Sequence, residues 1–209
     1  MSFQGFSKED FNTFNIDGLE PRMEAITSSI RPKFEQLAQE FTPTLSAYTG
    51  DEMYPHIAKH ARRTVNPPKD TWIAFAANKR GYKQHPHFQI GLWGTHLFVW
   101  FAMIYEAPLK SEYGKAFEKE LNTIFKNTPK DFVWSMDHMK PEAMKQSDMT
   151  KEDLAKVADR LQNVKKSELL CGIHIDANDP LLQDGDKLIN KIDETFKTLL
   201  PLYKIAQKL

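Results

Sequence analysis

Hydrophobic residues recur at intervals of three or four along five stretches of the chain, and this spacing predicts amphipathic helices. The apolar positions lie within residues 19–30, 34–48, 113–124, 154–164 and 188–203. Pro32 fits the first turn of the second helix, Pro43 is expected to kink or end it, and Gly50 is expected to stop it. Residues 7–10 and 150–153 each fit a capping box, which marks the start of a helix.

The middle of the chain changes to the period of two that marks strands. Trp72 and Ile73 fall on opposite faces of a strand at residues 71–77, and residues 88–92 alternate as a half-buried strand. Residues 97–105 are apolar on both faces, which places them at the centre of a sheet. Further strands are expected at residues 14–16, 132–134 and 168–175, whereas residues 54–64 fit either a helix or an extended segment.

Together these elements predict an α+β fold. Gly94-Thr95 suits a two-residue hairpin turn, so the central strands are expected to pair antiparallel. We expect a mixed but mostly antiparallel sheet of about five or six strands packed with about five helices. No internal repeat or low-complexity linker divides the chain, so a single α+β domain is expected over residues 1–209.

The cysteine count and the N-terminal segment narrow the class of protein. Cys171 is the only cysteine, so neither an intramolecular disulfide nor a cysteine zinc site is expected, and its apolar surroundings favour a buried thiol. The N-terminal segment lacks a basic region followed by an apolar one, and the longest apolar run is too short to span a bilayer. We therefore expect a soluble cytoplasmic protein without membrane association.

Residues 54–90, the basic segment, concentrate positive charge in a chain whose formal net charge is zero. The segment holds seven Lys or Arg residues against one acid, Asp70, so its balance is +6 and that of the rest is about −6. Arg and Lys with interleaved aromatic rings favour an anionic ligand: a nucleotide, a phosphorylated metabolite or a nucleic-acid backbone. The expected contacts are Arg62, Arg63, Lys79 and Arg80, with Trp72 and Tyr82 as stacking faces.

This hypothesis requires that the Lys79-Arg80 turn lie beside Arg62 and Arg63. If the cations are instead dispersed, they pair with carboxylates on neighbouring elements and the segment is structural. Both interpretations remain open from the sequence.

The histidines of the basic segment support a competing hypothesis. His56 and His60 would share a face of a helix, and His85 and His87 would share a side of a strand. The four could serve a metal-dependent or general-base enzyme, but the flanking cations oppose a bound dication, and we expect neither a metal nor another cofactor. His138, next to Asp137, would need a partner from elsewhere to act as a base.

Short catalytic signatures are absent from the chain. The sequence contains no GxGxxG, GxxxxGK[ST], GxSxG, HExxH or CxxC. This argues against the commonest dinucleotide-binding proteins, P-loop NTPases, serine hydrolases, zinc proteases and thiol redox proteins. Whether the protein is an enzyme stays open, and the sequence indicates no protein partner.

One long run of uncommon segments carries a family resemblance. The run GDEMYPHIAKHARRTVNPPKDTWIAFAANKRGYKQHPHFQIGLW at residues 50–93 resembles the signature of the bacterial YktB-like family of unknown function. The pieces IDGLEPRMEA, DHMKP and LLPLY fit the same family in the same order. The resemblance implies a single cytoplasmic α+β domain. It implies no reaction and no cofactor, so no catalytic residue is carried over.

Overall fold

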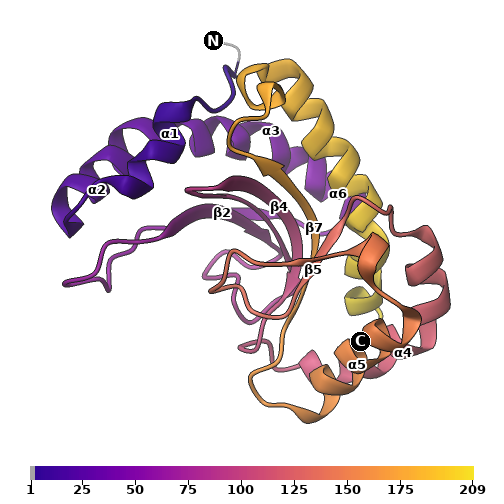
Figure 1. The fold of residues 1–209 in the computed structure, drawn as a ribbon. Helices are drawn as coiled ribbons and strands as arrows, with labels where there is room; N and C mark the ends of the chain where they lie inside the picture. The colour runs from indigo at the N-terminus through magenta and orange to yellow at the C-terminus, as the bar shows by residue number, and fades with distance from the viewer. Residues whose placement is uncertain (1–2) are drawn as a thin grey trace.

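A seven-stranded sheet forms the centre of the computed structural model, with strand order β1-β2-β3-β4-β7-β5-β6 (Figure 1). The model describes residues 3–209; residues 1–2, the start of the N-terminal segment considered above, lie outside the described residues. All the strand pairs are antiparallel, which confirms a mostly antiparallel α+β fold. The strands are β1 (Tyr54–Ile57), β2 (Asp70–Ala76), β3 (His87–Trp93), β4 (His96–Met103), β5 (Val133–Ser135), β6 (Met144–Lys145) and β7 (Leu169–Asp176).

The sheet has more strands than the five or six expected. The difference lies at its two edges, where the strands are too short to be recognised from the sequence. β1 has four residues and lies in the segment that fitted either helix or strand, and β6 has only two. Such short stretches carry too few positions for a periodic pattern. The hydrophobic run at residues 97–105 is confirmed as the central strand, β4.

The helices begin and end largely where the apolar pattern and the caps place them. Both capping boxes are present, at Ser7 and Thr150, and Gly50 ends α3 in a left-handed conformation with a φ of 79°. A π-helical turn joins α2 to α3, and α3 continues past Pro43. The helices are α1 (Lys8–Asn12), α2 (Leu19–Ala25), α3 (Arg31–Thr49), α4 (Lys110–Asn127), α5 (Lys151–Asn163) and α6 (Gly185–Gln207).

The prediction of a strand at residues 14–16 is wrong. The segment forms a 3-10 helix, Thr13–Asn15, that continues from α1. Its hydrogen bonds are local, since the Thr13 hydroxyl donates to the Glu9 carbonyl and the Ile16 N–H donates to the Thr13 carbonyl. Phe14 is buried, and a single apolar residue two positions before Ile16 fits a short helix as well as a strand, so the pattern alone did not separate them.

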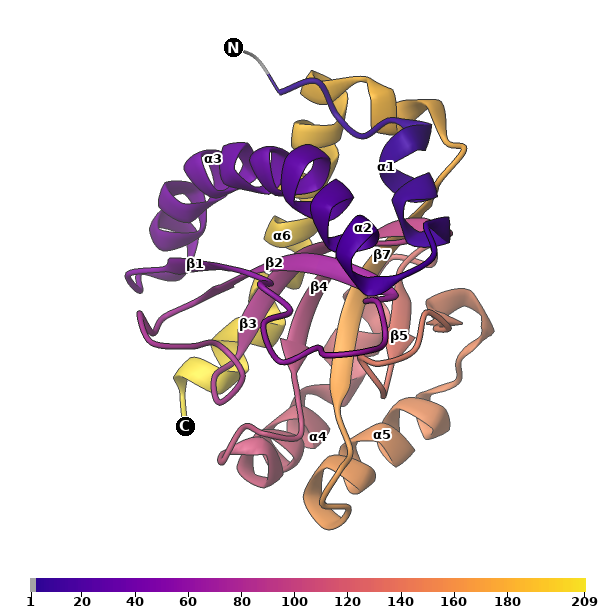
Figure 2. The same cartoon turned by 90° about the vertical axis from the view of Figure 1, so that its left-hand side faces the viewer.

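One face of the sheet packs against helices. α3 contacts β1 and β2, α6 contacts β4 and β7, and α4 packs between α5 and α6 (Figures 1 and 2). The Phe88 ring lies 5.3 Å from those of Phe196 and Tyr203, both on α6. This face therefore holds the main apolar core.

The opposite face, which we call the tryptophan face, carries Trp72, Trp93 and Trp100. The register places Trp72 opposite Gly91 and Trp100 opposite Gln89, so these side chains point the same way. A Cβ atom at Gly91 would lie 2.2 Å from the Phe98 ring, so only glycine lets this ring lie across the sheet. All of β3 is buried, not half-buried as expected, because this second apolar cluster covers its other side.

No helix within residues 3–209 is long and apolar enough to cross a membrane.

Candidate functional site

Four of the ring residues singled out in the sequence come together in the structure. The Trp72 indole N–H donates to the Tyr82 hydroxyl over 2.9 Å. The Tyr82 ring lies 4.9 Å from that of His87 and 5.8 Å from that of His56. The interleaving of aromatic rings and histidines in the sequence therefore corresponds to a cluster in space.

The remaining two histidines of the basic segment border this cluster. The His60 ring meets the edge of Trp72 at 5.5 Å, and its Nε2 lies 3.2 Å from the Thr71 hydroxyl. His60 has a φ of 51°, so it sits in a left-handed turn rather than on a helix face with His56. His85 contributes its backbone carbonyl, which lies 2.8 Å from Nδ1 of His87.

These histidines are suited to packing rather than to metal binding. Burial lowers the pKa of His56, and it lowers those of His60 and His87 to about 4, so these three rings are neutral at pH 7. No group of three or more His, Cys, Asp or Glu side chains among residues 3–209 could hold a metal ion. The rings have partners within the fold instead, among them the Asn78 carbonyl for His56.

The two pairs of cations expected to bind an anion lie at opposite ends of β2. Arg62 and Arg63 belong to the connection that enters the strand, whereas Lys79 and Arg80 form the turn that leaves it. Seven residues of β2 separate them, which corresponds to about 20 Å of extended chain. The fold therefore does not bring the four together, and Arg62, Lys79 and Arg80 are exposed.

Arg63 instead shares a hollow of about 620 Å³ with Arg22 and Lys69. We call this the cation hollow; Asn66, Pro67, Asp70, Trp93 and Met139 complete its lining. The Arg22 side chain is buried, and its guanidinium donates to the carbonyls of Ile16 and Pro68, each over 2.8 Å. The sequence held no signal for Arg22, because a single arginine in an amphipathic helix is ordinary.

Asp70 separates the cation hollow from a second, smaller cavity. It is the first residue of β2, it pairs with Trp93 across the sheet, and it lines both spaces. The smaller cavity measures about 10 Å³, which is room for one water molecule. Its polar lining residues are Asp70, Gln89, Ser135, His138 and Lys140. Burial raises the pKa of Asp70 to about 6, against the opposing charges of Arg63 and His138.

His138 is fixed on the other side of this small cavity by Glu168. Its Nδ1 lies 2.8 and 2.9 Å from the two carboxylate oxygens, and its backbone N–H donates to the same group over 2.8 Å. A carboxylate only accepts, so Nδ1 carries the proton and Nε2 is the remaining nitrogen. Burial lowers the pKa of His138, but the hydrogen bond and charge of Glu168 outweigh it, and the net pKa is raised.

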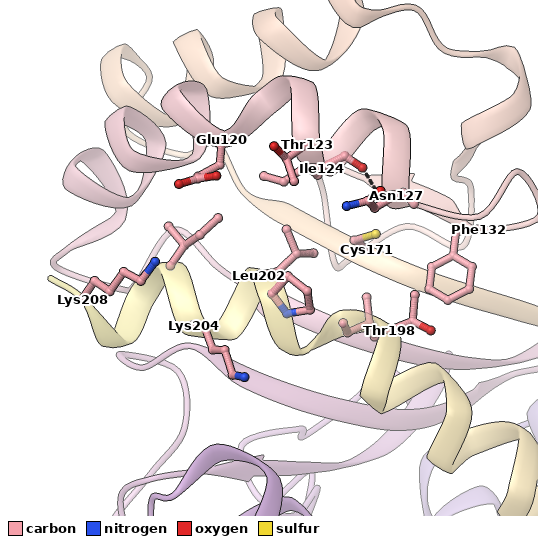
Figure 3. A pocket seen from close by; sticks show the side chains of 14 residues that line it. Glu120, Thr123, Ile124, Asn127, Phe132, Cys171, Thr198, Leu202, Lys204 and Lys208 are labelled. Carbon is pink, nitrogen blue, oxygen red and sulfur yellow. Dashed lines mark hydrogen bonds between the residues drawn. The ribbon is translucent and has the colours of Figure 1, made fainter.

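A separate apolar pocket of about 240 Å³ lies between α4 and α6 (Figure 3). Cys171, on β7, lies at its inner side, and Lys204, Lys208 and Glu120 project from the two helices (Figure 3). The Cys171 thiol is buried, and burial raises its pKa well above the ordinary value, so it stays protonated. This agrees with the expectation of a buried, unreactive cysteine. The titratable groups considered for function are therefore those described above on the tryptophan face.

The chain is similar to known proteins over nearly its whole length. A family model described as "Domain of unknown function (DUF1054)" matches residues 6–203. The chain is 55% identical over 208 residues to a UPF0637 protein of Bacillus velezensis, covering 100% of this chain and 99% of the relative. It is 53% identical to a UPF0637 protein of Bacillus licheniformis, with the same coverage, and 50% identical to one of Bacillus cereus, covering 100% of both chains. The chain therefore belongs to the DUF1054 (UPF0637) family, which confirms the resemblance to the bacterial YktB-like proteins.

Proposed function

We propose that the protein binds a small phosphorylated molecule in the cation hollow, with Arg22, Arg63 and Lys69 as the phosphate contacts. The ligand would be a cytoplasmic metabolite or nucleotide, in keeping with the location expected from the sequence. Arg63 belongs to the anion site expected from the sequence, whereas Arg22 comes from a helix distant in the chain.

The unpaired state of these three cations carries the proposal. None of them has a carboxylate oxygen within 4.0 Å in residues 3–209, although Asp70 lines the same hollow. Of the three, Arg22 is buried, Arg63 is half-buried and Lys69 is exposed. Burying a charge is costly unless an opposite charge compensates it, and the two carbonyls that accept from Arg22 are neutral. An anionic ligand would supply the missing charge.

The charge balance of the hollow favours a phosphate monoester over a carboxylate. Three cations and one ionised carboxylate leave a net charge of +2. A phosphate monoester carries a charge of about −1.5 to −2 at neutral pH, whereas a carboxylate carries only one negative charge. The forked guanidinium groups of Arg22 and Arg63 are also suited to paired hydrogen bonds with phosphate oxygens.

The shape of the hollow favours a small molecule over a nucleic acid. Its volume lies within the range of small-molecule sites, and Trp93 and Met139 offer apolar contact to the body of the ligand. A nucleic-acid strand would instead need cations spaced along a path. Lys79 and Arg80 do not continue such a path, because they lie at the far end of β2.

Isothermal titration calorimetry at low salt tests the proposal with AMP as the ligand and adenosine as its counterpart without phosphate. We expect AMP to bind and adenosine to bind at least ten times more weakly. In Arg63→Ala and Lys69→Ala the affinity for AMP should fall by about 10- to 100-fold each, the worth of a charged hydrogen bond. Lys119→Ala, which removes an exposed cation on α4, is the matched control.

Two results would contradict the proposal. One is the absence of AMP binding to the wild-type protein at millimolar concentration and low salt. The other is a loss of affinity in Arg80→Ala as large as that in Arg63→Ala, which would place the anion outside the hollow.

A further inference from the structure

We propose that the pocket between α4 and α6 binds a medium-chain carboxylic acid, with the alkyl chain on the apolar floor and the carboxylate at the rim beside Lys204 and Lys208 (Figure 3). This inference goes beyond the proposed function and does not rest on it. The pocket and the cation hollow share no lining residue, so each site can be tested without the other.

The floor of the pocket is apolar. Its side chains come from α4, α6, β7 and the segment before β5, and all of them are buried: Ile124, Phe132, Cys171, Leu199, Leu202 and Ile205. The Cys171 thiol adds no charge, because burial keeps it protonated. Such a floor favours an alkyl chain over a polar group, since contact with it removes apolar surface from water.

The volume of the pocket sets the length of the chain that it can hold. Apolar cavities of about 150 Å³ bind benzene, so in proportion the 240 Å³ of this pocket has room for about ten carbon atoms. Protein interiors are otherwise close-packed, with few voids larger than a water molecule. A space of this size above a buried apolar floor is therefore suited to a ligand of that length.

A buried contact fixes the spacing of the two helices beside the pocket. The Tyr113 hydroxyl, on α4, donates to the Leu202 carbonyl of α6 over 3.2 Å. Both residues are buried, and the Tyr113 ring packs against those of Phe101 and Phe117. A ligand thus meets a pocket that is already formed and does not have to part the helices, as is usual for small-molecule sites.

The charges at the rim favour an anionic head group. Lys204 and Lys208 lie at the C-terminal end of α6, and Glu120 lies on α4. Within residues 3–209, none of the three has an oppositely charged side chain within 4.0 Å. Two lysines against one glutamate leave the rim with a net charge of +1, which attracts a carboxylate and disfavours an ammonium group.

Isothermal titration calorimetry of the full-length protein with unbranched carboxylates, from hexanoate to tetradecanoate, tests the inference. Each added methylene should raise the affinity by about 3- to 4-fold up to decanoate. Beyond decanoate the affinity should stop rising or fall, because the pocket is then full. Absence of decanoate binding at millimolar concentration would overturn the inference. An affinity that keeps rising to tetradecanoate would also overturn it, since this indicates adsorption to an open surface.

Two substitutions of helical threonines locate the binding. Thr198 is exposed at the rim, and its hydroxyl donates to the Glu194 carbonyl within α6. Thr198→Trp should lower the affinity for decanoate by about tenfold or more, because the indole covers the opening. Thr44→Trp is the matched control: its hydroxyl makes the same bond within α3, to the Glu40 carbonyl, and it does not line the pocket. Equal losses in the two variants would overturn the location.

Charge variants test the head group. The double variant Lys204→Gln/Lys208→Gln should bind decanoate about 3- to 5-fold more weakly. Glu120→Gln should bind it more tightly, because Glu120 and Lys208 lie at the same end of the pocket (Figure 3). Lysines also stabilise the C-terminal end of a helix, so uncharged decanamide is the control ligand, and its affinity should not change in either variant. Equal losses for both ligands in the double variant, or tighter wild-type binding of decanamide than of decanoate, would overturn the assignment of a carboxylate.

Discussion

Replacement of Asp70 by Asn should stabilise the folded protein at neutral pH. Asp70 is half-buried at the start of β2, and no cation lies within ion-pair distance of its carboxylate in residues 3–209. The carboxylate therefore loses hydration on folding without gaining a direct ion pair. An amide of nearly the same shape avoids this cost, because it carries no charge.

The size of the effect follows from the change in proton affinity. The pKa of Asp70 rises from 3.8 to about 6 on folding, and each tenfold change in proton affinity corresponds to about 1.4 kcal/mol. The ionised carboxylate thus lowers the free energy of unfolding by about 3 kcal/mol above pH 6. Because the folded state binds the proton more tightly, this loss is absent below pH 3.8, grows as the pH rises from 3.8 to about 6, and is complete above that.

Urea unfolding of the wild type and Asp70→Asn at pH 4 and pH 7.5 measures this difference. We expect Asp70→Asn to be more stable by about 2–3 kcal/mol at pH 7.5 and nearly equal at pH 4. Asp176→Asn is the control, because its carboxylate is exposed and its pKa is lowered by hydrogen bonds from Asn178. An Asp70→Asn protein that is less stable at pH 7.5, or a difference that does not change with pH, would refute the reasoning.

Three other substitutions have definite expected costs, each measurable by urea unfolding. Glu168→Ala should lower the free energy of unfolding by about 2–4 kcal/mol at pH 6, because it breaks the buried pair with His138. This loss should shrink as the pH rises through the raised pKa of His138, and a loss that does not change with pH would contradict the reasoning. Gly172→Ala should cost more than about 3 kcal/mol or prevent folding, since its Cβ would lie 1.7 Å from the Val99 carbonyl oxygen; an unchanged urea midpoint would contradict this. Lys110→Met should cost about 1–3 kcal/mol, because the buried ammonium donates to two carbonyls at the end of α5; no loss would mean that water replaces it.

The sequence predicted the elements better than it predicted the site. The long helices and β4 were foreseen because each repeats its hydrophobic period over several turns or over both faces of a strand. Phe14 was misassigned and β1 left ambiguous because two to four residues cannot define a period. The fold class followed from the central hairpins, which are local in the chain.

The position of the candidate site depends on contacts that no local pattern records. The basic segment was found by its composition, but whether its cations meet depends on where β2 begins and ends, and the strand holds Arg63 apart from Arg80. Arg22 reaches the hollow across 46 positions of sequence, through the Pro68 carbonyl. The sequence indicated that His138 would need a distant partner, but only the pairing of β5 with β7 brings Glu168 to it.

The short edge strands affect how the chain behaves at high concentration. An exposed strand edge is a template for pairing with another chain, and long edges promote aggregation. At one edge β1 is only four residues long and contains Pro55, which has no N–H to donate to a neighbour. At the other edge β6 offers two residues, one of them Lys145. Both edges thus offer few free backbone groups to a further strand, which disfavours growth of the sheet from chain to chain.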